Sequence, residues 1–350
     1  MRNISYMIIC LLLALTSCDV HEWPDTPGYV KLHLRLNYET KMMKWEHTYD
    51  GNEVNEVGLG EIYDNHLDYG KIRYVIRTYP MSAKQRTTAD YKQQFVFVKD
   101  IAEGYDHEVT LDLLPGSYNI MVWSDLMQEN LGGYFYDASD FSEIRLQDTH
   151  GGNTDYRDAF KGNSTIALAS SIMEQMPDTL EIQMQRPLAK YEFVTNDVLE
   201  FISKEITRIT SLGIGNKSKE QAPTKVVDLN DYKVVFHYVG FMPNAYSIYT
   251  DEPVDSSTGV IFESGLKTLT ESEATLGFDY VFSYSSESFV SVQIGIYDNE
   301  GTQISLTAPI NIPLKRSHHT IMTGSFLMSQ TSGGVSINPE YDGDHNLIFP

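Results

Sequence analysis

The chain has 350 residues and is strongly acidic, with 48 Asp and Glu residues, 26 Lys and Arg residues and a formal net charge of −22. This charge excludes nucleic acid as a partner, because affinity for nucleic acid comes from neutralising phosphates, and it excludes attachment to an anionic membrane through a basic patch. The two cysteines, Cys10 and Cys18, both lie near the amino terminus. Loss of the segment before Cys18 would leave that residue as the only thiol, which excludes disulfides, cysteine zinc sites and other thiol nucleophiles.

The amino-terminal segment has the organisation of a bacterial lipoprotein signal. Arg2 precedes an apolar run from Met7 to Leu15, and Thr16-Ser17-Cys18 follows it. The run is too short to span a bilayer, which takes about 20 apolar residues. We expect cleavage between Ser17 and Cys18 and acyl chains such as palmitate on Cys18, each buried methylene contributing about 0.8 kcal/mol to membrane attachment. The alternative is an ordinary secretory signal that is cleaved elsewhere.

Residues 1–17 are thus the predicted signal peptide, and residues 18–28 are the predicted lipidated tether. The tether contains Trp23-Pro24 and Pro27-Gly28, which favour an extended chain. The lipid on Cys18 is the only cofactor that the sequence predicts. No later stretch is both long and apolar enough to span a membrane, so the rest of the chain is expected to be soluble.

Strand patterns begin directly after the tether. Val30, Leu32, Leu34 and Leu36 alternate with polar residues, which predicts a half-buried strand over 30–38. Residues 48–69 are acidic, contain Gly and Asn, and are interpreted as a long loop. Residues 125–165 are rich in Gly, Asp, Asn and Tyr and are interpreted as a loop excursion that can contain short elements. Further runs predict strands over 71–79, 95–98, 107–113, 117–123 and 179–185, with a hairpin turn at Pro115-Gly116.

The second half opens with an apolar run at 189–195, and residues 196–206 predict a short helix capped by Asp197. Further strands are predicted over 207–215, 232–240, 277–284, 290–297 and 320–328. Many short strands separated by turn signals indicate an all-β protein of two tandem β-sandwiches. The boundary is predicted near 186–188. This gives an N-terminal domain of residues 29–187 and a C-terminal domain with a tail of residues 188–350.

Candidate catalytic groups are few. Four acids in the predicted loop of 125–165 offer carboxylate pairs of the kind a glycosidase uses: Asp137, Asp140, Asp155 and Asp158. Neighbouring residues on a strand point to opposite faces, so His318 and His319 are not expected to bind one metal ion together. We therefore expect no metal and no enzyme activity, with a glycosidase as the remaining enzymatic alternative.

Four segments carry a resemblance to a known family, in addition to the signal ending at Cys18. They are Leu114-Pro115-Gly116-Ser117-Tyr118, Val122-Trp123-Ser124-Asp125, Arg186-Pro187-Leu188-Ala189-Lys190 and Pro313-Leu314-Lys315-Arg316-Ser317-His318. In this order they resemble the Bacteroidetes fimbrillin and fimbrial-anchor lipoproteins. The resemblance implies two transthyretin-like β-sandwich domains, lipid anchoring at the outer membrane with exposure at the cell surface, and a role as pilus subunit, pilus anchor or adhesin.

The resemblance also implies partners. Other fimbrial subunits would bind by strand exchange, in which an added strand pairs with an open sheet edge. The segments that could take part are Val30–Tyr38 and, in the tail, residues 334–338 and 346–349. A host or bacterial surface receptor is a further partner. The alternative function is glycan capture for an uptake system, with Tyr134, Phe135 and Tyr136 as exposed aromatic rings that stack on sugars.

Overall fold

The computed structural model describes residues 28–64, 67, 70–81, 90–101, 107–127, 133–147, 151–169, 178–213 and 227–329. The predicted signal peptide, Cys18 and the carboxyl-terminal tail lie outside these residues. In the described part of the chain, no helix is both long and apolar enough to cross a membrane.

The fold is all-β, as predicted, and its described residues form five sheets around two cores. The first half of the chain contributes β1 (Val30–Tyr38), β2 (Lys41–Tyr49), β3 (Val54–Asp64), β4 (Lys71–Pro80), β5 (Gln93–Asp100), β6 (His107–Leu113), β7 (Gly116–Met127), β8 (Tyr136–Asp137), β9 (Ile144–Leu146), η4 (Asp155–Arg157), β10 (Ala159–Leu168) and β11 (Asp178–Met184). The second half contributes β12 (Leu188–Thr195), α2 (Val198–Gly213), η5 (Leu229–Asp231), β13 (Tyr232–Tyr238), β14 (Met242–Ser247), β15 (Glu252–Ser257), β16 (Ile261–Gly265), β17 (Lys267–Thr268), β18 (Ala274–Phe282), β19 (Ser288–Asp298), β20 (Gln303–Leu306), β21 (Ile310–Leu314) and β22 (His318–Gly324).

The first sandwich packs the sheet β11-β1-β6 against the sheet β10-β7-β4-β5. Strand β1 follows the predicted alternation, because Leu32, Leu34 and Leu36 are fully buried in the core between the sheets. On the other face, Arg35 lies directly opposite Glu108 on β6 and Glu181 on β11 and binds both carboxylates. The pattern of period two therefore fixes both the face and the register of this strand.

Strand β7 is buried on both faces, unlike β1. Its second face is covered by a small sheet, β15-β14-β9-β8, that combines strands from both halves of the chain. Trp123 of β7 packs edge-on against Tyr136 of β8, with ring centres 5.5 Å apart. The segment 125–165, predicted as a loop excursion, therefore contains β8, β9, η4 and most of β10. Strand β9 pairs with β14 of the second half, whereas β10 pairs with β7 inside the first sandwich.

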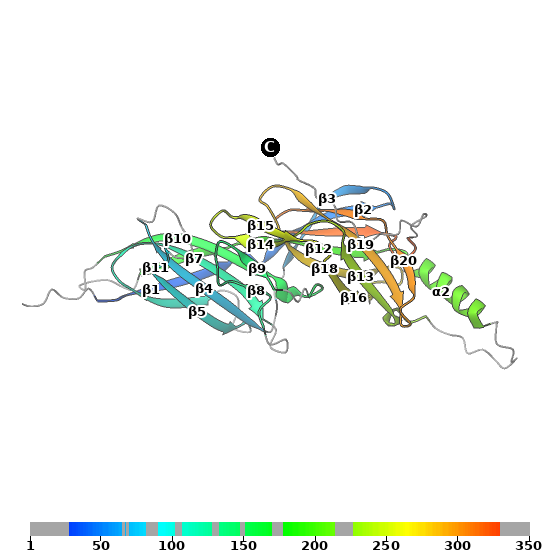
Figure 1. Cartoon of the computed structure of the whole chain (residues 1–350), viewed down its shortest axis with the longest axis horizontal. Coiled ribbons are helices and arrows are strands. Elements are labelled where there is room, and N and C mark those ends of the chain that lie inside the picture. Colours follow the sequence, from blue (N-terminus) through cyan, green and yellow to red (C-terminus); the bar gives the residue numbers. More distant parts are fainter. Residues whose placement is uncertain are drawn as a thin grey trace, which may run out of the picture.

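The second sandwich packs the sheet β17-β18-β12-β22-β2-β3 against the sheet β16-β13-β19-β20, with β21 also paired to β19. Its core is rich in aromatic rings, among them Phe193, Phe236 and Phe326. Aromatic residues bury large areas and suit strands, which explains their abundance in this half. The molecule is elongated, with the first sandwich at one end of the long axis and the second sandwich with α2 at the other (Figure 1).

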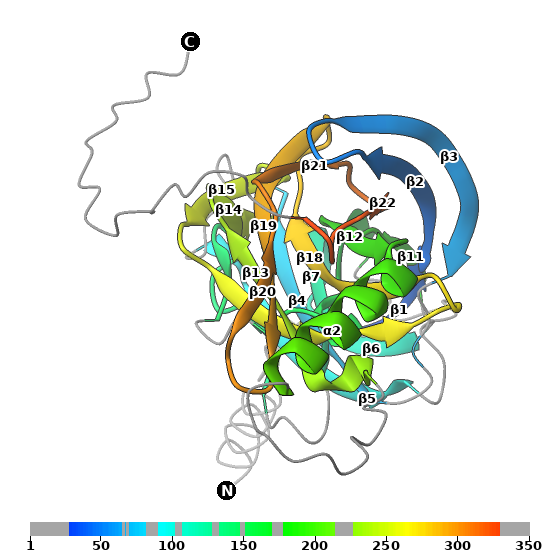
Figure 2. The same ribbon diagram turned by 90° about the vertical axis from the view of Figure 1, so that its right-hand side faces the viewer.

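Strands β2 and β3 cross from the first half of the chain into the second sandwich, where β2 pairs in parallel with β22. The prediction that residues 29–187 form one self-contained domain is therefore wrong, although the chain does pass between sandwiches at 185–187. The loop predicted over 48–69 is also wrong, since β3 fills much of it. Strand β3 has eleven residues and its partner β2 has nine, and two register shifts place the extra residues on the outer strand. The ribbon consequently bends into the arc seen in Figure 2.

Helix α2 exists where a helix is predicted but runs to Gly213 instead of ending near residue 206. The prediction of a strand over 207–215 is therefore wrong for residues 207–213, which are helical, and residues 214–215 lie outside the described residues. Asp197 stands at the expected cap position, because its carbonyl accepts the first helical hydrogen bond from Phe201. Its carboxylate accepts a hydrogen bond from the backbone N–H of Met328, 2.8 Å away, and so holds the chain that follows β22.

Candidate functional site

A buried ionic cluster occupies the junction between the two sandwiches. Arg186, in the segment between β11 and β12, is fully buried and donates from Nε to both carboxylate oxygens of Asp158 at 2.8 and 2.9 Å. Its other nitrogens donate to the carbonyls of Glu39 and Thr40, at 2.8 and 2.7 Å. Residues 39–40 are the crossing from β1 to β2. One guanidinium group thus holds two of the places where the chain passes from one sandwich to the other.

A second buried pair lies next to the first. Arg157 of η4 binds the carboxylate of Asp279 on β18, and both side chains are almost completely buried. Tyr238 donates to the other oxygen of Asp279 at 2.7 Å, and Tyr191 donates to Tyr238 at 2.8 Å. Burial and the charge of Asp279 raise the pKa values of both tyrosines well above their usual range. Each member has a charged or hydrogen-bonded partner, which is the arrangement expected of a structural network.

Lys190 completes the junction inside a cage of aromatic rings. Its ammonium group lies 2.8 Å from Asp155, and 4.2 and 4.8 Å from the ring centres of Phe278 and Tyr63. Such a cage recognises cations. Here the cation is the protein's own lysine, so the cage serves packing between η4, β3 and the sheet of β12.

The four acids considered for glycosidase chemistry do not form an acid–base pair. Asp158 and Asp155 are bound by Arg186 and Lys190, as described above. Asp137 accepts hydrogen bonds from Ser139, and these lower its pKa, whereas a general acid requires a raised one. Asp140 accepts hydrogen bonds from Ser142 in a local turn. Each of the four acids thus has a structural partner: an arginine or a lysine for Asp158 and Asp155, and a nearby serine for Asp137 and Asp140.

The two adjacent histidines have different surroundings, as predicted for neighbours on a strand. His319 is buried and lies 2.9 Å from a carboxylate oxygen of Glu192. His318 is partly exposed, and its Nδ1 lies 2.9 Å from the carbonyl oxygen of Arg316. Within the described ranges, no group of three or more His, Cys, Asp or Glu side chains could hold a metal ion.

The aromatic residues considered for glycan contact are less exposed than expected. The expectation is wrong for Tyr136, which is 1% exposed and donates to the carbonyl of Arg157 at 2.7 Å. Tyr134 and Phe135 are half-buried. The guanidinium of Arg73 lies 3.7 Å from the centre of the Tyr134 ring and covers one face of it. A stacking role at Tyr134 and Phe135 remains a prediction.

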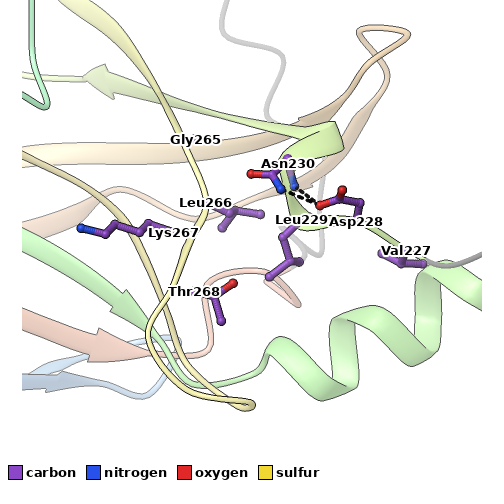
Figure 3. A pocket seen from close by; sticks show the side chains of 8 residues that line it. All are labelled: Val227, Asp228, Leu229, Asn230, Gly265, Leu266, Lys267 and Thr268. Atoms are coloured by element: carbon purple, nitrogen blue, oxygen red, sulfur yellow. Dashed lines mark hydrogen bonds between the residues drawn. The ribbon is translucent and has the colours of Figure 1, made fainter.

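One cavity of about 620 Å³ opens between η5 and the β16–β17 segment (Figure 3). It is lined by Val227, Asp228, Leu229, Asn230, Gly265, Leu266, Lys267 and Thr268. Asn230 donates from its backbone and side chain to Asp228, at 2.9 and 2.8 Å, so this carboxylate is already engaged. The lining offers one further charge, Lys267, and no histidine, and it brings together no acid–base or nucleophilic group.

Strand β3, residues Val54–Asp64, forms the outer edge of its six-stranded sheet. Within the described residues β3 pairs only with β2, so its other edge lies open. Val57, Leu59 and Ile62 are 63%, 61% and 61% exposed. Sequence reasoning missed this strand because acids and glycines interrupt its pattern, although the alternation of Val57 and Leu59 is a signal that could have indicated it.

Strand exchange at the predicted segments gains no support from the described strands. Val30–Tyr38 is β1, which pairs with β11 on one side and with β6 on the other, so it is a central member of its sheet. The tail segments 334–338 and 346–349 lie outside the described residues, as do Ser17 and Cys18.

Several solved structures are similar to the chain at low sequence identity. A proposed adhesin from Bacteroides thetaiotaomicron is 11% identical, with 80% of this chain and 79% of that chain covered and a TM-score of 0.43. The fimbrial anchor protein Mfa2 from Porphyromonas gingivalis is 10% identical, with coverage of 79% and 82% and a TM-score of 0.36. A fimbrial assembly protein from Parabacteroides distasonis is 12% identical, with coverage of 87% and 93% and a TM-score of 0.38. No curated protein matches the chain.

A family model matches nearly the whole chain. It covers residues 26–350, from just before β1, through both sandwiches, to the last residue. The chain therefore belongs to the family of unknown function DUF6562.

Proposed function

We propose that this protein is a lipid-anchored, non-enzymatic surface protein that acts as a fimbrial subunit, a fimbrial anchor or an adhesin. The observation that carries the proposal is that the described chain begins at one end of an elongated molecule. Strand β1 begins at one end of the long axis, and the second sandwich with α2 lies at the other (Figure 1). A lipid on Cys18, upstream of β1, would hold the first sandwich near the outer membrane and present the second sandwich outward.

The junction supports a mechanical role of this kind. The crossing of β2 and β3 adds two strands of the first half to the second sandwich. Buried pairs at Arg186 and Arg157 then fix the halves to each other. A body held in this way transmits force from its membrane end to its outer end. The fimbrial role itself is the one that the sequence resemblance implies.

Lipid attachment is tested in cells that express the full chain. We expect an alkyne-labelled fatty acid to mark the wild-type protein in the outer-membrane fraction and to leave Cys18→Ala unlabelled. Cys10→Ala is the matched control, because Cys10 lies inside the predicted signal and should retain the label. Equal labelling of wild type and Cys18→Ala, or none in either, would contradict the anchoring.

The fimbrial role is tested by co-purification. We expect sheared pili to carry the wild-type protein in a ladder that survives mild heating, and the ladder or the surface adhesion to be lost when the gene is deleted. A protein that never accompanies pili, but binds glycans in affinity gels, would instead support the glycan-capture alternative. Tyr134→Ala and Phe135→Ala would then weaken that binding if these rings make the contact.

A further inference from the structure

The outer edge of β3 has no neighbouring strand in the part of the chain that the structure describes. The strand is eleven residues long, and only the edge facing β2 is paired among the described strands. Among the described residues, the backbone–backbone hydrogen bonds outside regular strands include none from residues 54–62. An open edge of this length is a template for another strand, and proteins usually protect such edges with lysine, proline or a covering segment.

The sequence of β3 lacks two of these protections. Residues 50–64 contain no Lys, no Arg and no Pro. Three apolar side chains, Val57, Leu59 and Ile62, are instead more than 60% exposed. The two register shifts bend the strand, so an added strand would pair with a short stretch of it. The surface therefore suits a short extended segment whose alternate side chains are apolar.

The edge strand of the first sandwich shows the contrast. Strand β5 also ends its sheet and exposes Val96 and Val98, at 54% and 45%. Lys99 of β5 reaches across to donate to the carbonyl of Glu108 on β6, 3.0 Å away. A lysine thus protects the edge at β5, whereas β3 contains no lysine.

The negative charges around β3 favour a basic binding partner. Five acids lie on the strand or just before it: Asp50, Glu53, Glu56, Glu61 and Asp64. Glu56 accepts a hydrogen bond from the indole of Trp45 at 2.9 Å. Asp64 lies opposite Lys41, which is on β2. A second copy of this chain would bring the same acids to the edge, and its net charge of −22 would oppose approach. A different chain with basic residues is therefore favoured.

We propose that β3 accepts, by strand addition, an extended segment of another protein in which apolar residues alternate with Lys or Arg. Backbone hydrogen bonds supply the affinity, and the exposed valine, leucine and isoleucine contact the apolar side chains of the added strand. The carboxylates of Glu53 and Glu61 attract the basic side chains. The inference rests on the proposed role in surface assembly and names the edge at which a partner binds.

The test uses residues 18–350, which omit the predicted signal peptide, and a short fluorescent peptide of alternating valine and lysine. We expect the peptide to bind, to bind more weakly as salt is added, and to slow hydrogen exchange within residues 54–64. Leu59→Lys should weaken binding about tenfold, equivalent to roughly 1.4 kcal/mol. Val96→Lys on β5 is the matched control and should leave the affinity unchanged.

Three outcomes would overturn the inference. The first is equal affinity for wild type and Leu59→Lys, and the second is slowed exchange at 93–100 or another edge with none at 54–64. The third is equal affinity for a peptide with glutamate in place of lysine. A lipidated chain that accompanies pili but does not bind the peptide would contradict the strand-addition inference alone. Peptide binding at β3 by a chain that is neither lipidated nor associated with pili would contradict the proposed function alone.

Discussion

Arg157 and Asp279 are 122 residues apart in the sequence and form an ion pair that is almost completely buried between η4 and β18. The pair joins a helical turn of the first half of the chain to the sheet of the second sandwich. Two charges out of water are stable only while each has its partner, because an isolated buried charge loses its hydration without compensation. The pair is therefore sensitive to the loss of either member.

Arg157→Met is expected to lower the free energy of unfolding by about 3–5 kcal/mol, since it leaves Asp279 buried without its counter-charge. Urea unfolding followed by tryptophan fluorescence measures the change. Arg35→Met is the matched control, because Arg35 pairs with Glu108 and Glu181 at the surface, and its midpoint should equal that of wild type. An unchanged midpoint for Arg157→Met would show that the junction does not depend on this pair.

Arg186→Lys is expected to lower the free energy of unfolding by roughly 1–3 kcal/mol, although the charge is kept. One ammonium group cannot reproduce the guanidinium fork that reaches Asp158 and the carbonyls of Glu39 and Thr40 together. Hydrogen exchange should therefore become faster at residues 39–41. Arg145→Lys, at a half-exposed surface pair, should leave exchange there unchanged. If exchange at residues 39–41 of Arg186→Lys equals that of wild type, the guanidinium group does not hold this crossing.

The sequence pattern was sufficient where one face of a strand lies in a core. Leu32, Leu34 and Leu36 on β1 alternate with polar residues because the opposite face meets solvent, and the predicted strand matches the observed one. The same reasoning fails for β3, because both of its faces are largely exposed and its composition is that of a loop. It also could not show that Ile144 and Ala245 lie in neighbouring strands, since β9 pairs with β14 over a hundred residues away.

The candidate surface was beyond sequence reasoning for a related reason. Which edge of a sheet stays open depends on the order of strands, and that order is set by the parallel pairing of β2 with β22 from the far end of the chain. The predicted lipid site at Cys18 is local in the sequence and needs no such pairing. It remains a prediction, because it lies outside the described residues.

The fragment 188–350 is expected not to fold alone. Without β2 and β3, strand β22 would become an exposed edge, and Trp45, which is 5% exposed in the whole chain, would be missing from the sheet. We expect the fragment to aggregate or to lack near-ultraviolet circular dichroism, whereas residues 28–350 give a folded species. Cooperative unfolding of the isolated fragment would show that the second sandwich does not need β2 and β3 to fold.

Acidification is expected to destabilise the protein through His319. Burial lowers the pKa of His319, and nearby Lys190 adds to this effect, although the carboxylate of Glu192 at 2.9 Å favours the charged ring. The unfolded chain, with a histidine pKa of about 6.5, then binds more protons than the folded chain. Stability must therefore rise with pH across the window just below 6.5 and fall as the pH is lowered through it.

His319→Gln removes this titration, so the loss of stability between neutral pH and about pH 5.5 should be smaller than in wild type. Burial also lowers the pKa values of His47 and His237, so part of the slope should remain. Urea unfolding at several pH values measures the difference, and the chemical shifts of the His319 ring report its protonation directly. A ring that is charged at pH 6.5, or a pH slope equal to that of wild type, would show that Glu192 outweighs burial at this position.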